Sequence, residues 1–223
     1  MTDRRFAFVG ESIENELRTQ RIDTRPELRE NDGKNIVCGY ASVFYRADNP
    51  GTQFRLATKI YERIMPGAFD KAIARDEVSG LFNHDESLVL GSNVAGTMSL
   101  SVDEHGLRYD IDLGDTTVAR DVAVSIGRQD VRGSSFAFIV EAVNWRDEKE
   151  FEVREITDVR LFDVGPVTRP AYRATSTGLR DDGPKEDWQK EHDNWREHKR
   201  AVGMWEGNLL HARTRLSEID HTV

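Results

Sequence analysis

The sequence predicts a mixed α+β fold, rich in strands and built on a barrel or a strongly bent sheet. Short apolar stretches recur along the middle of the chain, turn signals separate them, and only a few segments show helical spacing. Many short strands with a few inserted helices are typical of this fold class. The 223 residues suffice for one sizeable core plus appendages.

The first strands are expected around a tight hairpin turn. Residues 31–34 read Asn-Asp-Gly-Lys, and Asp-Gly tolerates the positive φ that short hairpin loops need. The apolar run over residues 35–45 is then the returning strand. It contains Cys38, the only cysteine of the chain. We interpret Cys38 as a buried small hydrophobe rather than a nucleophile, and a lone cysteine suits a reducing cytoplasm.

Two short helices are expected among the strands. Pro66 opens the first helix, in which Phe69 and Ile73 lie one turn apart. The second helix begins after a capping side chain, which is either Asp115 or Thr116. Its apolar residues recur at four-residue spacing, and they are Val118, Val122 and Ile126.

The remaining strands lie on either side of the second helix. A hairpin is expected around residues 103–106, and its second arm alternates apolar with polar residues. Further along the chain, a polar turn at residues 146–149 separates apolar stretches. The expected strands are residues 97–102, 107–113, 134–143, 151–156 and 159–164.

The amino-acid composition along the chain divides it into three regions. Residues 1–18 are a polar N-terminal arm, residues 19–178 are the folded domain, and residues 179–223 are a charged helical tail. In the tail, Trp188 and Trp195 lie on one face of an otherwise charged helix. Two interpretations are open: the tryptophans dock on their own domain, or they dock on another protein.

The charge and hydropathy of the chain narrow its function classes. The formal net charge is −9, with 38% hydrophobic and 32% charged residues. A general nucleic-acid binder would carry a basic balance or patch, so this class is disfavoured. No 18-residue apolar run is present, and the N-terminus lacks the features of a signal peptide. We therefore expect no membrane span, no nucleic acid and no cofactor.

The histidine best placed for chemistry is His84. It follows the apolar stretch over residues 78–82, within the sequence Asn-His-Asp. A half-shielded histidine at a strand end can stay neutral near pH 7 and accept a proton. The surroundings of His84 alone leave open a structural, hydrogen-bonded role.

The candidate nucleophile is one of two adjacent serines. If residues 133–140 form a strand, Ser134 lies on the same face as Phe136 and Phe138, which must face the core. Ser135 then lies on the opposite face beside Ala137, where small side chains leave room for a substrate. Ser135 is therefore the better candidate, although a serine at a strand start also has a purely structural interpretation.

A buried carboxylate can orient the histidine. Asp163 is the only carboxylate within the apolar run over residues 159–166, and burying it without a partner would be costly. Its donor can be a histidine ring N–H, Arg160 or backbone amides. Glu155 and Asp158 compete for the same role from a more polar stretch. The chain order would be His, Ser, Asp, which is acceptable because triads are defined by geometry and role.

An ordered series of short motifs runs from residue 39 to residue 177. It comprises Gly39–Phe44, Glu62–Ile64 leading into Pro66–Phe69, Asn83–Asp85, Leu90–Gly91, Gly106–Leu107, Ser135–Phe136 and Val167–Tyr172. In this order, the chain resembles the prohead (capsid-maturation) protease family of tailed bacteriophages, typified by the enzymes of HK97-like phages. Each motif alone is weak, and the ordered set is specific.

This resemblance implies a herpesvirus-assemblin-like β-barrel surrounded by a few helices, and a serine–histidine mechanism. Matched motif by motif, the catalytic residues fall on His84, Ser135 and Asp163. The family commonly has a glutamate where this chain has Asp163, which would be a shorter equivalent. From their nearness in sequence to Asp163, we expect the backbone amides of Thr168 and Arg169 to hold the oxyanion.

The resemblance also implies substrates, partners and a location. The expected substrates are the phage scaffold or the scaffold-like part of the major capsid protein, together with the protease itself, cleaved inside the assembling prohead in the host cytoplasm. A homodimer is a further expectation, because related viral proteases depend on dimerisation. One rival is a non-catalytic capsid-assembly module with a degenerate protease fold. Another is a metal hydrolase using residues 84–86 with His105 as a further ligand.

Overall fold

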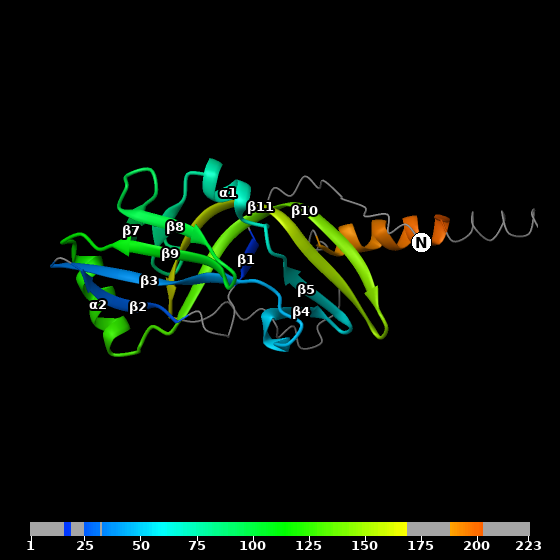
Figure 1. Cartoon of the computed structure of the whole chain (residues 1–223), viewed down its shortest axis with the longest axis horizontal. Helices are drawn as coiled ribbons and strands as arrows, with labels where there is room; N and C mark the ends of the chain where they lie inside the picture. Colours follow the sequence, from blue (N-terminus) through cyan, green and yellow to red (C-terminus); the bar gives the residue numbers. More distant parts are fainter. Residues whose placement is uncertain (1–15, 19–24, 32, 169–187, 203–223) are drawn as a thin grey trace, which may run out of the picture. The chain divides into compact units, whose positions relative to one another are not determined.

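A computed structural model describes residues 16–18, 25–31, 33–168 and 188–202. The chain splits into two units, Met1–Leu179 and Arg180–Val223. The first unit contains a seven-stranded sheet, a four-stranded sheet and two helices (Figure 1).

The larger sheet is built around one long antiparallel hairpin of strands β10 and β11. Its strand order is β1-β10-β11-β5-β4, with β6 paired to β11 and β7 paired to β6. Both β5 and β6 run parallel to β11, and they pair with different stretches of it. The bounds are β1 Glu16–Arg18, β4 Gln53–Ala57, β5 Ile60–Ile64, β6 Ser79–Leu81, β7 Val89–Ser92, β10 Gly133–Glu148 and β11 Phe151–Val167.

The smaller sheet contains the two hairpins that the sequence predicts. Its order is β2-β3-β9-β8, with bounds β2 Glu27–Asn31, β3 Lys34–Val43, β8 Met98–Val102 and β9 Gly106–Asp112. Asn31 pairs with Lys34 across the first turn, where Gly33 has the positive φ of +75° that such a turn needs. In β9, Leu107, Tyr109 and Ile111 are fully buried, which confirms the predicted alternation.

The core of the first unit contains apolar side chains from both sheets. The rings of Phe136 and Phe138 on β10 stack with their centroids 4.7 Å apart, and the ring of Phe69 meets Phe136 edge-on at 5.5 Å. Figure 1 shows β3 and β9 passing beside β10 and β11. The side of β10 that carries the phenylalanines is therefore the core side, as predicted.

Both predicted helices are present, one of them shorter than expected. Helix α1 spans Asp70–Arg75, because the chain from Pro66 to Phe69 forms a turn before it. Helix α2 spans Thr117–Gly127, and Thr116 is its cap, since its hydroxyl accepts a hydrogen bond from the Ala119 N–H at 3.1 Å. A single-turn 3-10 helix, η1, covers Pro50–Thr52 before β4.

Two features of the first unit differ from the predictions. The described strands form two open sheets, and no closed barrel is found among them. The segments 151–156 and 159–164, expected as separate strands, are one strand, β11, and the turn shifts to residues 149–150. Irregular pairings near Glu141, Thr157 and Phe162 let this long hairpin bend without breaking.

The expected N-terminal arm and tail contain described secondary structure. Glu16–Arg18 forms β1, which pairs with Phe136–Phe138 on the outer edge of β10. In the second unit, residues 188–202 are helical. There, the Trp195 ring lies on His192 with centroids 5.9 Å apart, and Lys199 Nζ lies 5.1 Å from the ring centroid. No helix within the described ranges is long and apolar enough to cross a membrane.

Candidate active site

His84 and Asp163 are in direct contact. The Nδ1 atom of His84 lies 2.5 Å from Oδ1 of Asp163, and the two side chains are only 15% and 12% exposed. A neutral imidazole that donates from Nδ1 leaves Nε2 as an acceptor. The His84 Nε2 atom is buried and has no hydrogen-bond partner among the described residues. The pair therefore presents a proton-accepting nitrogen on the side away from Asp163.

The loop that carries His84 is held in an unusual backbone conformation. Asn83 and His84 both have φ of +57°, a region that residues other than glycine rarely adopt. The Asn83 N–H donates to the Pro166 carbonyl at 3.1 Å, and its side-chain oxygen accepts from the Thr168 N–H at 2.8 Å. These bonds fix the loop to the end of β11. Strained conformations of this kind persist only where the surroundings hold them, and they cluster at functional sites.

A single extra residue in β11 turns Asp163 to the face of the sheet that carries Ser135. Leu161 pairs with Phe138 and Asp163 pairs with Ala137, so Phe162 is an inserted bulge residue. Side chains two residues apart on a strand normally share a face. Because of the insertion, Leu161 points into the core with Phe138, whereas Asp163 shares the opposite face with Ala137.

Side chains alternate between the two faces of β10, so Ser134 and Ser135 lie on opposite faces. The Ser134 hydroxyl lies 2.8 Å from the hydroxyl of Tyr109 on β9, so it bridges the two sheets inside the core. Burial raises the pKa of Tyr109 well above its usual range, and this hydroxyl stays neutral. Ser135 pairs with Gly165, two residues beyond Asp163 on the neighbouring strand. Such diagonal positions have Cα atoms roughly 7–8 Å apart, a separation that an imidazole bonded to Asp163 can span.

Gly165 allows the His84 loop to approach this face closely. A Cβ atom placed on Gly165 would lie 1.9 Å from the carbonyl oxygen of Leu81, far inside van der Waals contact. The backbone of Leu81, the last residue of β6, therefore lies against Gly165, the residue that pairs with Ser135. Ser135 is 0% exposed, like Ser134. The open space that the sequence suggests beside Ser135 is filled in this structure by the chain itself.

The competing carboxylates have other partners. Glu155 accepts a hydrogen bond from Arg146 at 3.1 Å, and Asp158 accepts one from Lys71 at 2.5 Å. Neither contact involves His84. Of the three carboxylates considered from the sequence, Asp163 is the one that contacts the histidine.

Of the two expected oxyanion donors, Thr168 is the one that the structure describes, and it lies next to the His84 loop. The Thr168 N–H donates to the Asn83 side chain at 2.8 Å, so it is engaged in this structure. Arg169 lies outside the described residues. Asn83 is the contact that sequence reasoning missed, because an asparagine before a histidine gives no signal of a bond to a residue 85 positions away.

The residues proposed for a metal site have other surroundings. Asp85 accepts hydrogen bonds from the hydroxyl and the N–H of Ser87, and these bonds lower the pKa of the Asp85 carboxyl. Across the described ranges, no three His, Cys, Asp or Glu side chains gather so that they could hold a metal ion. Cys38 is buried as predicted, and burial raises the pKa of its thiol.

One face of the larger sheet brings together a buried serine and a carboxylate that is bonded to a histidine. These are the residue types of a serine-type hydrolase. The sequence profile of the caudovirus prohead serine proteases matches residues 20–186, and the chain belongs to this family. The resemblance to prohead proteases is thereby confirmed.

Two further comparisons accompany this family match. Among solved structures, the chain is similar to the bacteriophage T4 capsid assembly protease, with 12% identity and a TM-score of 0.43. That similarity covers 70% of this chain and 99% of the T4 chain. No curated protein sequence matches the chain.

Proposed function

We propose that the chain is a serine endopeptidase in which Ser135 is the nucleophile, His84 the general base and Asp163 the carboxylate that orients His84. The observation that carries this proposal is the 2.5 Å contact between His84 and Asp163, on the face of β10 and β11 that also carries Ser135. Membership of the prohead serine protease family supports the reaction type.

In the proposed reaction, His84 Nε2 takes the hydroxyl proton of Ser135 while Oγ forms a bond to the scissile carbonyl carbon. Asp163 stabilises the resulting imidazolium and keeps the proton on Nδ1. The tetrahedral intermediate collapses as the C–N bond breaks, and His84 returns its proton to the leaving amine. A water molecule then attacks the acyl-enzyme by the same proton route and releases Ser135.

The mechanism requires two local changes from the described structure. Ser135 is fully buried, so the groups that cover it must move for a peptide to reach the hydroxyl. Backbone amides at Thr168 and Arg169 are the proposed oxyanion donors. The Thr168 N–H donates to the Asn83 side-chain oxygen. To bind the oxyanion, this N–H must release Asn83 and donate to the oxyanion instead.

The proposed substrates are the phage scaffold, or the scaffold-like part of the major capsid protein, and the protease itself. Cleavage would take place inside the assembling prohead in the host cytoplasm. The family to which the chain belongs supports these assignments. The likeness to herpesvirus assembly proteases and a homodimeric state remain parts of the proposal that follow from the sequence resemblance.

The decisive experiment is co-expression with the cognate capsid and scaffold proteins, followed by mass spectrometry of all three chains. The parent protein should produce defined cleavage products. Ser135→Ala should abolish them, because loss of a triad serine or histidine costs on the order of 10⁶ in rate, and Asp163→Asn should slow cleavage by about 10⁴.

Ser134→Ala is the matched control, since it removes the neighbouring hydroxyl from the core face of the same strand. It should cleave at close to the parent rate, provided that it folds. Normal cleavage by Ser135→Ala together with loss in Ser134→Ala would reverse the assignment of the nucleophile. A parent protein that leaves both partner chains intact would favour the non-catalytic capsid-assembly module.

A further inference from the structure

One edge of β11 has a gap between its two parallel neighbours. Residues 152–156 pair with β5, and residues 163–164 pair with β6. Within the described residues, no strand pairs with the intervening stretch on this edge. Buried backbone groups left without partners are costly, so something else must satisfy this stretch.

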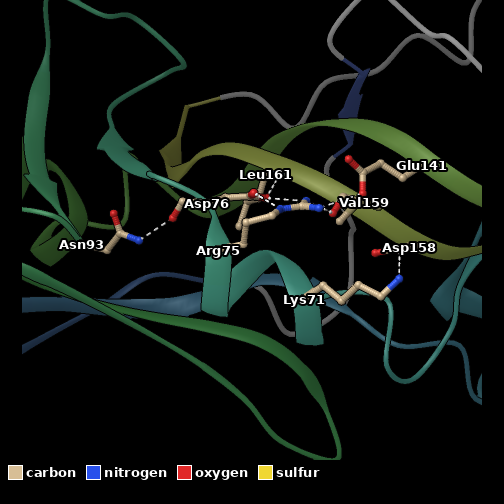
Figure 2. A network of polar contacts seen from close by, with 8 residues as sticks. All are labelled: Lys71, Arg75, Asp76, Asn93, Glu141, Asp158, Val159 and Leu161. Atoms are coloured by element: carbon tan, nitrogen blue, oxygen red, sulfur yellow. Dashed lines mark hydrogen bonds and ion pairs between the residues drawn. The ribbon is translucent and has the colours of Figure 1, made fainter.

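Side chains of α1 and of Asp76, the residue that follows it, lie along this gap (Figure 2). Lys71 Nζ donates to Asp158 at 2.5 Å, and the Arg75 guanidinium lies 3.4 Å from the Val159 carbonyl oxygen. At the end of this series, the Asp76 carboxylate accepts a hydrogen bond from the Leu161 N–H at 2.8 Å. Arg75 and Asp76 thus offer side-chain partners to backbone groups that a strand would otherwise pair with.

Asp76 is itself tightly held. Its side chain is 5% exposed, and Arg75 Nε donates to the carboxylate at 2.6 Å. The Asn93 side chain donates to the Asp76 carbonyl at 2.9 Å and accepts from the Val78 N–H at 2.8 Å. The carboxylate therefore sits at a fixed position relative to the start of β6, the strand that leads to His84 (Figure 2).

The bond to Leu161 lies directly before the bulge that turns Asp163 out of the core. Leu161 is the last residue in register before Phe162, and Asp163 is the first after it. A bulge needs a local anchor, because without one the strand can slip by a residue and turn its side chains to the other face.

We propose that Asp76 is a positioning residue for the active site: by holding the Leu161 N–H it fixes the Phe162 bulge, and so directs the Asp163 carboxylate at His84. This proposal rests on the proposed function for its kinetic consequence. Its structural consequence, the geometry of the His84–Asp163 bond, does not depend on protease activity.

Three variants test the role of Asp76. Asp76→Ser is too short to reach Leu161, Asp76→Asn keeps an oxygen acceptor of the same length, and Lys71→Ala removes a neighbouring contact of α1 without touching the bulge. The first readout is cleavage of a peptide that spans a mapped cleavage site. For Asp76→Ser we expect kcat to fall about 100-fold with little change in KM, as for a misplacement near 1 Å. The other two variants should stay within a few-fold of the parent.

The second readout is the proton NMR signal of His84 Nδ1–H, which a short bond to a carboxylate shifts far downfield. The signal is assigned by its loss in Asp163→Asn. It should be present in the parent protein, in Asp76→Asn and in Lys71→Ala, and absent or strongly shifted in folded Asp76→Ser. Because this measurement needs no substrate, it tests the positioning role even if the parent protein cleaves nothing.

Three results would overturn the proposal. The downfield signal could survive unchanged in Asp76→Ser, it could disappear equally in Lys71→Ala, or it could be absent from the parent protein. If Asp76→Ser does not fold, Asp76→Asn decides: a folded Asn variant that loses the signal rules out the acceptor role, and one that keeps both signal and kcat supports it.

Discussion

At the residue scale, the arrangement of the site depends on positions that have no reactive group. Phe162 shifts the register of β11 so that Asp163 leaves the core face. Gly165 lets the His84 loop approach the sheet opposite Ser135. Asn83 fixes that loop to Thr168. The positions of the reactive side chains therefore depend on the inserted residue Phe162, on the absence of a side chain at Gly165 and on the side-chain amide of Asn83.

Gly165→Ala should disrupt this placement. The added methyl would lie 1.9 Å from the Leu81 carbonyl oxygen, so β6 and the His84 loop must move away. We expect the free energy of unfolding, measured with urea, to fall by about 1–3 kcal/mol. The downfield signal of His84 should weaken at the same time.

Gly114→Ala is the matched control for this prediction. Nothing lies within 4 Å of a Cβ at Gly114, and the substitution should be neutral or stabilising by up to about 1 kcal/mol. A Gly165→Ala protein as stable as the parent would contradict the close approach of Leu81.

The sequence predicts which residues form the candidate site better than it predicts what surrounds them. His84 and Asp163 were each selected from their local stretch, and the structure brings them together. Strand alternation separated Ser134 from Ser135, and the contact of Ser134 with Tyr109 in the core agrees with it. The bulge at Phe162 could not be predicted, because the pattern of apolar residues does not say where pairing slips. The burial of Ser135 is not predicted either, because strand alternation says which face a side chain lies on and not what covers that face.

At the element scale, the β10–β11 hairpin is the main departure from the predicted strands. The polar residues 146–149, Asp147 among them, predict a turn, whereas Glu152 lies in an expected strand. In the structure Asp147 and Glu152 pair with each other across the two strands. Local composition marks strand ends poorly where a hairpin extends beyond the core.

The far end of this hairpin is fixed by an arginine. Arg63 on β5 donates two hydrogen bonds to the Glu148 carboxylate, at 2.6 and 2.9 Å. Its guanidinium also lies 3.9 Å from the centroid of the Tyr45 ring. The Arg63 side chain is 4% exposed and that of Glu148 35% exposed. The hydrogen bonds from Arg63 lower the pKa of the Glu148 carboxyl below its ordinary value of 4.5.

This contact predicts a pH-dependent contribution to stability. A carboxyl whose pKa is lower in the folded protein stabilises the fold fully above the unfolded-state pKa, and the contribution is lost as pH falls through the folded-state pKa. We expect Glu148→Gln to be less stable than the parent by about 1 kcal/mol at pH 7, since the pair is partly solvent-exposed. The difference should shrink below pH 4.5.

Urea unfolding of both proteins between pH 3 and pH 7 measures this effect. Glu150→Gln at pH 7 controls for the removal of a carboxylate from the same turn, since Glu150 is exposed. A stability difference that stays constant down to pH 3 would contradict the assigned role of Glu148.

At the scale of the whole molecule, the family match and the compact units do not end at the same residue. The match ends at residue 186, whereas the first unit ends at Leu179. The helix over residues 188–202 lies beyond both. Both interpretations of its two tryptophans, docking on their own domain or on another protein, stay open. We propose that the segment is removed during maturation.

If the protease processes itself, co-expressed parent protein should accumulate a form that ends near residue 178. Intact-mass spectrometry of the purified chain would detect the loss of the tail. Ser135→Ala should remain full length, because trimming requires the proposed nucleophile. Equal trimming of the Ser135→Ala protein would instead assign the cut to a host protease.

The strand β1 has a consequence for how a substrate can approach. Glu16–Arg18 occupies the outer edge of β10 beside Phe136–Phe138, next to Ser135. Backbone groups that are already hydrogen-bonded cannot bond to a second chain. An extended peptide can therefore pair with this stretch of β10 only by displacing β1, and the N-terminal segment and an incoming strand compete for one edge. A strand-like ligand at this edge must therefore bind β10 more strongly than β1 does.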